Sequence, residues 1–263
     1  ETNLPLRIGL LIDTSSSIRT RFQFEQEAAI DFLHTVLRPK TDKAFIISFD
    51  AEPELVQDLT GDPIDLAEAI RELRPGGGTT LYDAIYLAAK MKMAKSTDEQ
   101  GRPFRKLLIV LSDGNDTGSL VTREEALEMA RRHDVTVFTV STSAMPIQYS
   151  GRSMELQDPC KVMGQEGDKV LRRYAEATGG TAYCPFNTID VGRSFERIAN
   201  ELRSQYTITY NPTNKERVRR FREIRISIRR KGLEVHHRPG YYARTEEDED
   251  EDDKTQVDLF GSG

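Results

Sequence analysis

The feature that most constrains this chain is an apolar stretch, residues 8–12, that ends at once in the pattern Asp13-x-Ser15-x-Ser17. A continuous apolar run of strand length is typical of a strand buried on both faces of a parallel sheet. The carboxylate and the two hydroxyls can converge only if the chain turns sharply after the strand. Oxygen ligands of this kind suit hard divalent cations such as Mg²⁺. A structural explanation stays open, because a serine-rich loop before a helix also supplies N-cap oxygens.

Two later stretches favour the metal hypothesis. In residues 75–83 three glycines let the backbone approach another group closely, and the hydroxyl of Thr79 follows at once. In residues 106–114 a second apolar strand ends in Asp113 and a glycine, which repeats the layout of the first strand. Ligands of open α/β sheets bind beyond the carboxyl ends of the strands, so Asp13 and Asp113 are expected to face one crevice. Thr80 is an alternative to Thr79, and the sequence does not decide between them.

These three motifs, in this order, resemble the metal-ion-dependent adhesion site of the von Willebrand factor type A domain. The resemblance spans about residues 6–205. It is closest to the related proteins of acidobacteria-like bacteria, on the basis of the stretch that begins at Gly76 and the terminal Gly-Tyr-Tyr at residues 240–242. The resemblance implies a divalent cation, Mg²⁺ or Mn²⁺ with Ca²⁺ also possible, and a secreted or periplasmic bacterial protein. The site it implies comprises Asp13, Ser15, Ser17, Thr79 and Asp113.

The donor types themselves favour protein binding over catalysis. Three neutral hydroxyls and two carboxylates leave a divalent cation poorly neutralised, so the cation can attract an Asp or Glu of a protein partner. We therefore predict a metal-dependent adhesion or protein-binding module that is not an enzyme. The resemblance implies that the serines and the threonine contact the metal, and that the aspartates act directly or through water.

The remaining pattern predicts a Rossmann-like, doubly wound α/β fold. Strands alternate with helices, which favours a mainly parallel sheet with helices on both faces. Along the helix at 24–37, Phe24, Ala28, Phe32 and Val36 recur at helical spacing. Asp62 is expected to cap the next helix, with Pro63 in its first turn. Further helices are expected at 63–73, 82–94, 122–133, 168–177 and 191–201, and further strands at 43–49, 54–57, 135–140 and 181–184.

From residue 204 onward the apolar period changes to two. Residues 206–210 and 224–229 alternate apolar and polar side chains, and a turn at 231–232 precedes 233–235, which predicts an antiparallel β extension. Nine of the 17 residues in 215–231 are Lys or Arg, which raises the alternative of a nucleic-acid surface. A solvated strand face is favoured, because stacking aromatics are scarce beyond Phe221.

The C-terminal tail explains the net charge of −6. Residues 246–253 are eight consecutive acids, and such a run repels itself and stays disordered. The predicted organisation is a von Willebrand factor A-like domain at 1–205 with an inserted loop at about 144–166. An antiparallel β extension at 206–244 packs on or beside it, and an acidic disordered tail follows at 245–263.

Several features carry no firm assignment. Cys160 and Cys184 are compatible with one disulfide and equally with two free thiols. The apolar runs are strand-sized and predict no membrane span. The chain starts at Glu1 without a charged, apolar leader, so the compartment cannot be read from that end. The partner and the oligomeric state are not encoded in any motif.

Two competing functions remain at this level. A metal-dependent hydrolase or phosphoryl-transfer enzyme would need a general base or an activated nucleophile beside the metal, and no such motif is present in the sequence. A structural or assembly domain would use the basic C-terminal strands, and its binding would depend on salt and ignore chelators.

Overall fold

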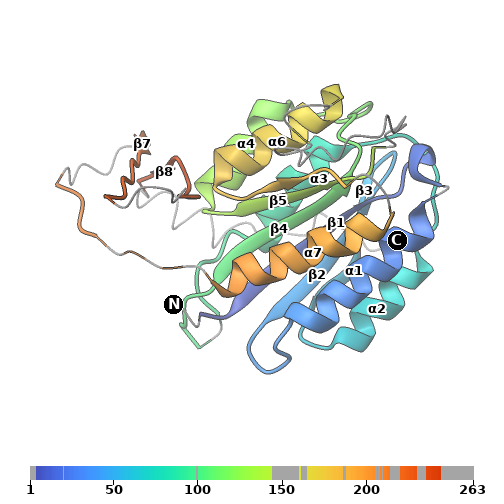
Figure 1. The fold of residues 1–263 in the computed structure, drawn as a ribbon, viewed down its shortest axis with the longest axis horizontal. Helices are drawn as coiled ribbons and strands as arrows, with labels where there is room; N and C mark the ends of the chain where they lie inside the picture. Colours follow the sequence, from blue (N-terminus) through green and yellow to red (C-terminus); the bar gives the residue numbers. More distant parts are fainter. Residues whose placement is uncertain are drawn as a thin grey trace.

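The computed structural model describes residues 4–19, 21–98, 100–143, 160, 165–185, 188–204, 206, 208, 210–213, 220–229 and 235–243. Its centre is a six-stranded sheet in the order β3-β2-β1-β4-β5-β6 (Figure 1). The edge strand β3 is antiparallel to its neighbour, and the other pairs are parallel. The strands are β1 (Leu6–Asp13), β2 (Lys43–Phe49), β3 (Pro53–Thr60), β4 (Arg105–Ser112), β5 (Thr136–Ser141) and β6 (Ala182–Tyr183). The predicted mainly parallel sheet is confirmed.

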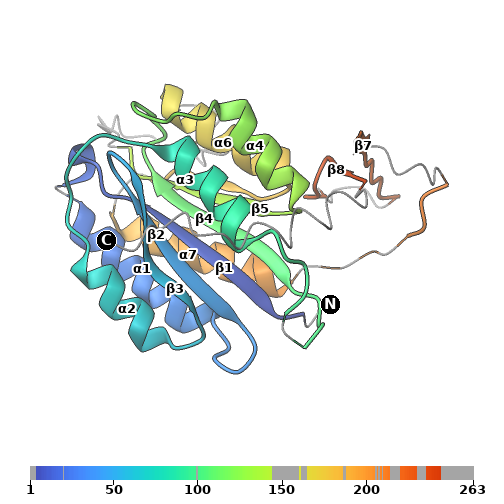
Figure 2. The ribbon, with the colours of Figure 1, turned by 180° about the vertical axis from the view of Figure 1, so that it is seen from behind.

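Helices cover both faces of the sheet (Figures 1 and 2). One face carries α1 (Phe22–Val36), α2 (Pro63–Glu72) and α7 (Thr188–Arg203), and the other carries α3 (Leu81–Leu87), α4 (Arg123–Arg132) and α6 (Glu166–Thr178). Successive side chains of β1 point to opposite faces, so Leu10 enters the core beneath α1 while Leu11 enters the core beneath α3. Gly9 lies where a Cβ would collide with Phe45 and Leu108. This two-sided burial explains why the strand reads as a continuous apolar run.

The helix cap predicted at Asp62 forms, and a second cap is found at Thr122. The Asp62 side chain accepts a hydrogen bond from the backbone N–H of Ile64 at 2.8 Å. Thr122 and Glu125 form a reciprocal capping box at the start of α4. Each interaction satisfies backbone donors that the first helical turn leaves unpaired.

The buried face of α1 differs from the one expected from Phe24. Phe24 is 60% exposed, whereas Phe22, Ala29 and Leu33 enter the core. The expected spacing joined Phe24 to Phe32 and Val36, which are buried, but Phe24 itself points to solvent. Glu25 also lies on the buried face of α1. The pattern missed this position because carboxylate side chains are normally expected on the solvent side.

The helix expected at 82–94 is divided. It begins as α3 and continues as one π-helical turn, η2 (Ala88–Lys92). The apolar spacing does not reveal this change of hydrogen-bonding pattern.

The C-terminal extension is antiparallel, as predicted, but uses other residues. Its strands are β7 (Phe221–Glu223) and β8 (Gly240–Tyr242). Residues 224–229 are not a strand, nor are the described positions Tyr206, Ile208 and Tyr210, whose exposed fractions are 77, 70 and 52%. An alternating apolar and polar sequence forms a strand only where it can pair with another strand and pack on a surface. Among the described residues, neither lies beside these side chains.

The two short strands lie beside the C-terminal ends of α4 and α6, away from the carboxyl edge of the sheet (Figure 1). The guanidinium of Arg131 lies 4.9 Å from the centre of the Phe221 ring, and its Nε donates to the carbonyl of Ala177 at 3.0 Å. Arg238 forms an ion pair with Asp134, and its backbone contacts Gly179 so closely that a Cβ there would collide.

Cys160 and Cys184 form a disulfide, which decides between the two alternatives left by the sequence. Of the inserted loop predicted at 144–166, only Cys160 and residues 165–166 are among the described residues. The predicted acidic tail lies outside the described residues. Within the part of the chain that is described, no helix combines the length and apolarity that crossing a bilayer requires.

Candidate metal site

Three loops meet at the carboxyl edge of the sheet. They follow β1, precede α3 and follow β4. The backbone N–H of Gly76 donates to the carbonyl of Thr14 at 2.6 Å, which joins the first loop to the second. The backbone N–H of Thr117 donates to the carbonyl of Thr79 at 2.9 Å, which joins the second to the third. The sheet topology therefore brings together motifs that lie about a hundred residues apart in the chain.

Three of the predicted ligands are in direct contact. The Oγ atoms of Ser15 and Ser17 lie 2.9 Å apart. Ser17 Oγ donates to Asp113 Oδ2 at 3.2 Å, while Asp113 Oδ1 accepts the backbone N–H of Asn115 at 2.9 Å. Two hydroxyls and one carboxylate thus form a continuous row of oxygens.

Asp13 is fully buried and held from both sides. Its Oδ1 accepts the backbone N–H of Ser15 at 2.9 Å, and its Oδ2 accepts the hydroxyl of Ser112 at 2.6 Å. Burial raises the pKa of the Asp13 carboxyl above its ordinary value, the hydrogen bonds from Ser112 and Ser15 act against this shift, and the charge of Asp113 adds to it. Ser112 was not among the predicted site residues, although it directly precedes Asp113.

The two candidate threonines differ in their hydroxyls. Thr80 Oγ1 donates to the backbone carbonyl of Asp50 at 3.1 Å. The backbone N–H of Thr79 donates to Thr117 Oγ1 at 3.0 Å, and the side-chain hydroxyl of Thr79 makes no hydrogen bond within the described part of the chain. Of the two, Thr79 therefore combines a fixed backbone with an uncommitted hydroxyl.

A close approach of two glycines fixes the loop that carries Asp113. Gly114 has a φ of 77°, and a Cβ there would collide with the carbonyl of Gly167 at the start of α6. A Cβ on Gly167 would in turn collide with the carbonyl of Asp113. The sequence contains no local signal for this contact, because it joins distant segments.

Glu25 is a further acidic group at the site that the sequence did not indicate. Its side chain is 2% exposed, and its Oε2 has no hydrogen-bond partner among the described residues. Burial raises the pKa of Glu25 to about 8, which the positive charge of Arg21 opposes and the negative charges of Asp13 and Asp113 reinforce. The carboxyl is consequently neutral at pH 7.

The donor atoms fit a small divalent cation. Ser15 Oγ and Ser17 Oγ are hydrogen-bonded to each other at 2.9 Å, which is close enough for one cation to contact both oxygens. The uncommitted hydroxyl of Thr79 is a further polar atom that a cation could satisfy. The described residues contain no cluster of three or more His, Cys, Asp or Glu suited to a metal, so the hydroxyls are necessary to this site.

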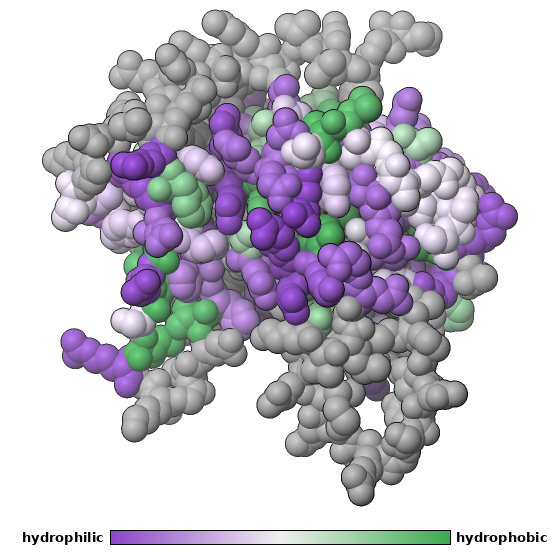
Figure 3. Space-filling model, turned by 90° about the horizontal axis from the view of Figure 1, so that it is seen from above, coloured by the Kyte–Doolittle hydropathy of each residue, from purple (hydrophilic) through white to green (hydrophobic). Residues whose placement is uncertain are grey.

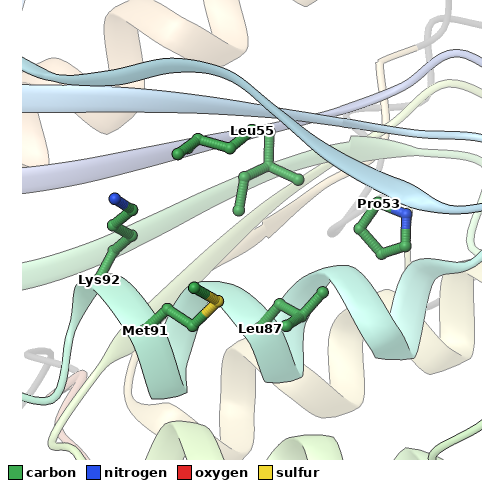
Figure 4. Close-up of a pocket in the computed structure, with 6 residues that line it drawn as sticks. Pro53, Leu55, Leu87, Met91 and Lys92 are labelled. Atoms are coloured by element: carbon green, nitrogen blue, oxygen red, sulfur yellow. The ribbon is translucent and has the colours of Figure 1, made fainter. Parts of the chain in front are cut away.

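An apolar depression lies elsewhere, between β3 and the helical segment formed by α3 and η2 (Figure 4). It is lined by Ile47, Pro53, Leu55, Leu87, Met91 and Lys92, and none of the predicted ligands contributes to it. The face built from α3, α4 and α6 is mainly hydrophilic (Figure 3). The three loops at the carboxyl edge, and not this depression, therefore carry the groups that could bind a cation.

Comparison with known proteins agrees with this geometry. Residues 8–115 match the model of the von Willebrand factor type A domain, and this range includes every predicted ligand. Over this stretch the chain is similar to the von Willebrand factor type A domain. No curated protein sequence matches the chain, and the acidobacterial subgroup stays a prediction.

Solved structures share the fold of this chain. A von Willebrand factor type A protein from Catenulispora acidiphila is 18% identical with a TM-score of 0.56, over 75% of this chain and 42% of that one. An aerotolerance-related membrane protein from Bacteroides fragilis is 17% identical with a TM-score of 0.54, over 74% of this chain and 99% of that one. Proximal thread matrix protein 1 from the mussel byssus, solved with a zinc-occupied MIDAS motif, is 16% identical with a TM-score of 0.54.

The last comparison covers 75% of this chain and 46% of the mussel protein. This chain thus spans less than half the length of two of these three structures. At these identities the comparisons establish the fold, and ligands and partners are separate questions.

Proposed function

We propose that this domain binds a protein partner through a divalent cation held by Asp13, Ser15, Ser17, Thr79 and Asp113. The observation that supports this most strongly is the row of oxygens from Ser15 through Ser17 to Asp113, at the carboxyl edge of the sheet. The uncommitted hydroxyl of Thr79 supports its choice over Thr80.

The charge of the site supports binding of an acidic group. Hydroxyl ligands are neutral, and the oxygens of Asp13 already accept hydrogen bonds from Ser15 and Ser112. A bound cation would supply an electrophilic position that attracts an Asp or Glu of the partner. The residues of the chain hold the ligand oxygens in place, because their backbone groups are bonded to neighbouring loops.

We propose Mg²⁺ or Mn²⁺ as the resident ion. Hydroxyl and carboxylate oxygens are the ligands that these hard cations prefer, and the two serine oxygens lie close enough for one ion to contact both. The zinc found in the MIDAS motif of the mussel protein supports a divalent cation of similar size.

We further propose that the protein acts outside the cytoplasm, in adhesion or assembly. The Cys160–Cys184 disulfide supports this location, because structural disulfides persist mainly in oxidising compartments. A structure of the PilB minor pilin from Streptococcus sanguinis, 12% identical with a TM-score of 0.55, has the same fold in a pilus protein.

The test has two stages. Mn²⁺ binding is measured by electron paramagnetic resonance for the wild type, Asp113→Asn and Asp31→Asn, the last being a control that removes an equal charge from the exposed side of α1. We expect Asp113→Asn to weaken binding at least a hundredfold and Asp31→Asn to leave it unchanged.

The second stage identifies the partner. Surface proteins of the source organism are captured on the wild type in Mg²⁺, on the wild type in chelator and on Asp113→Asn in Mg²⁺. We expect a protein retained only in the first condition. The proposal is wrong if the same proteins are captured in all three, and salt-dependent capture would then favour the basic C-terminal segment.

A further inference from the structure

The first turn of α6 contains a buried aspartate that is hydrogen-bonded to a neighbouring strand. Asp168 is 1% exposed and lies two residues after Glu166, the first residue of α6. Its Oδ2 accepts the backbone N–H of Gln165 at 2.9 Å, which caps the helix locally. Its Oδ1 accepts the hydroxyls of Ser141 at 2.5 Å and Ser143 at 3.3 Å, both at the carboxyl end of β5. Capping uses one oxygen of this side chain, so the other oxygen serves a contact between elements.

The start of α6 also contacts the loop that carries Asp113. The Ser143 hydroxyl lies 3.4 Å from the backbone carbonyl of Asp113, so its proton is shared between that carbonyl and Asp168. Gly167, which precedes Asp168, packs so closely on the carbonyl of Asp113 that a Cβ on this glycine would collide with it. Two separate contacts therefore join the first turn of α6 to a candidate metal ligand.

The same hydrogen bonds continue to the other candidate carboxylate, Asp13. The backbone N–H of Thr142 donates to the carbonyl of Ser112 at 2.9 Å, and the backbone N–H of Gly114 donates to Ser112 Oγ at 3.0 Å. Ser112 Oγ in turn donates to Asp13 Oδ2 at 2.6 Å. The strands β1, β4 and β5 are neighbours in that order, so one set of hydrogen bonds holds their carboxyl ends together.

A comparable hydrogen bond ties the opposite end of α6 to β5. Thr178 Oγ1 is buried and accepts the backbone N–H of Val137 at 2.9 Å. Thr178 lies ten residues beyond Asp168 on the same helix, which corresponds to about 15 Å along the axis. Both side chains fix α6 on β5, but only Asp168 adjoins the candidate ligands. Comparison of the two ends can therefore separate positioning of a ligand from simple helix packing.

We propose that Asp168 is a positioning residue of the cation site. Through Ser143 and Gly167 it fixes the backbone of Asp113, and so raises the affinity for the cation. This inference rests on the proposed function, because it needs a cation at Asp113. Ser17 Oγ donates to Asp113 Oδ2, so a shift of the Asp113 backbone would move this carboxylate away from the serine oxygens. Groups that orient metal ligands typically contribute about 10–100-fold to metal affinity.

The experiment compares three variants with the wild type. In Asp168→Asn an amide NH₂ group replaces one acceptor oxygen and faces groups that donate, so the contact with β5 weakens while the side chain keeps its size. Ser143→Ala removes only the hydroxyl that reaches Asp113, and it is the milder variant should Asp168→Asn not fold. Thr178→Val is the matched control, because it breaks the hydrogen bond between α6 and β5 at the far end.

Mn²⁺ affinity is measured by electron paramagnetic resonance, and stability by urea unfolding in chelator. We expect Asp168→Asn to bind Mn²⁺ about tenfold more weakly than the wild type and Ser143→Ala about threefold, whereas Thr178→Val keeps the wild-type affinity. Asp168→Asn and Thr178→Val should both lower the urea midpoint. The spectrum of bound Mn²⁺ should broaden in Asp168→Asn alone, because a displaced carboxylate makes the coordination less symmetric.

The outcomes separate this inference from the proposed function. If Asp168→Asn and Ser143→Ala bind Mn²⁺ as tightly as the wild type, Asp168 only anchors the helix and the inference is overturned, although the cation site stands. An equal loss of affinity in Thr178→Val and Asp168→Asn overturns it as well, because packing of α6 would then explain both. If the wild type binds no Mn²⁺, the proposed function fails and this inference fails with it.

Discussion

The carboxyl edge of the sheet and the C-terminal unit formed by β7 and β8 are held in contrasting ways. At the carboxyl edge, three loops are joined by backbone hydrogen bonds, and Asp13 and Thr79 are at most 5% exposed. The C-terminal unit contacts the domain through a stacked arginine, an exposed ion pair and one close backbone approach. Apolar colour is visible at the left edge of Figure 3, on the side where Figure 1 has β7 and β8.

The difference shows which region gives up folding stability in order to present ligand oxygens. The carboxyl edge holds polar groups that would each be more stable in water, so it concentrates ligands at a cost to the fold. The C-terminal unit has few buried polar groups and makes few contacts with the rest of the domain among the described residues. Substitutions should therefore have large effects on stability and cation affinity at the first region, and small effects on stability alone at the second.

The largest expected effect concerns Glu25 in the protein without cation. The native state keeps a proton on Glu25 up to about pH 8, whereas the unfolded chain loses it near pH 4.5. Between these values the native state binds more protons, so this carboxyl lowers the free energy of unfolding as pH rises, and above about pH 8 its effect is constant. A tenfold change in a protonation equilibrium corresponds to about 1.4 kcal/mol, so we expect Glu25→Gln to gain roughly 3–5 kcal/mol over the wild type across this pH range.

Urea unfolding in chelator at pH 5, 7 and 9 measures this difference. Glu27→Gln should follow the wild type at all three pH values, since its carboxyl is exposed. A stability difference between the wild type and Glu25→Gln that does not change with pH would contradict the assignment of a neutral carboxyl.

The next effect concerns the two glycines behind Asp113. Gly114→Ala adds a methyl group where the carbonyl of Gly167 lies and imposes a positive φ on alanine, so we expect a loss of about 2–4 kcal/mol and weaker Mn²⁺ binding. Gly101→Ala is the matched control, because Gly101 has a φ of 72° but open space around it. It should lose only about 1 kcal/mol and keep its affinity. Equal losses for both variants would show that the close approach to α6 is unimportant.

The sequence predicted well those features that depend on neighbouring residues. The strand at Lys43–Phe49 was predicted with its observed bounds, and the predicted cap at Asp62 depends on a side chain that bonds its own helix. The motif residues lie at the edge expected from strand direction. Local patterns sufficed because each of these structures is determined by a few adjacent residues and by burial on a predictable face.

The missed features depend on contacts between distant segments. The helical spacing of apolar residues did not mark Glu25 as buried, because that pattern counts apolar side chains only. The contact of Gly114 with Gly167 joins β4 to α6, and no local signal marks it. Residues 206 and 208 alternate like a strand but lack a neighbour among the described residues.

A smaller effect is expected at Arg131, which joins the C-terminal unit to the domain. Arg131→Ala removes the stack on Phe221 and the hydrogen bond to Ala177, so we expect a loss of about 1–2 kcal/mol. Hydrogen exchange should show faster opening of β8, and Mn²⁺ affinity should stay the same. A change in affinity would mean that the two regions are coupled, which would remove the distinction drawn between them.

The smallest effect is expected for the ion pair between Asp134 and Arg238. Asp134 has a φ of 56°, a backbone conformation that asparagine also adopts readily, so Asp134→Asn removes the charge without straining the chain. Both side chains are nearly half exposed, and solvent and salt screen such pairs, so we expect a loss below about 1 kcal/mol that vanishes in about 1 M NaCl. Thermal unfolding at low and high salt measures it. A larger loss that persists in salt would show that the C-terminal unit is an integral part of the domain, held as firmly as the loops at the carboxyl edge.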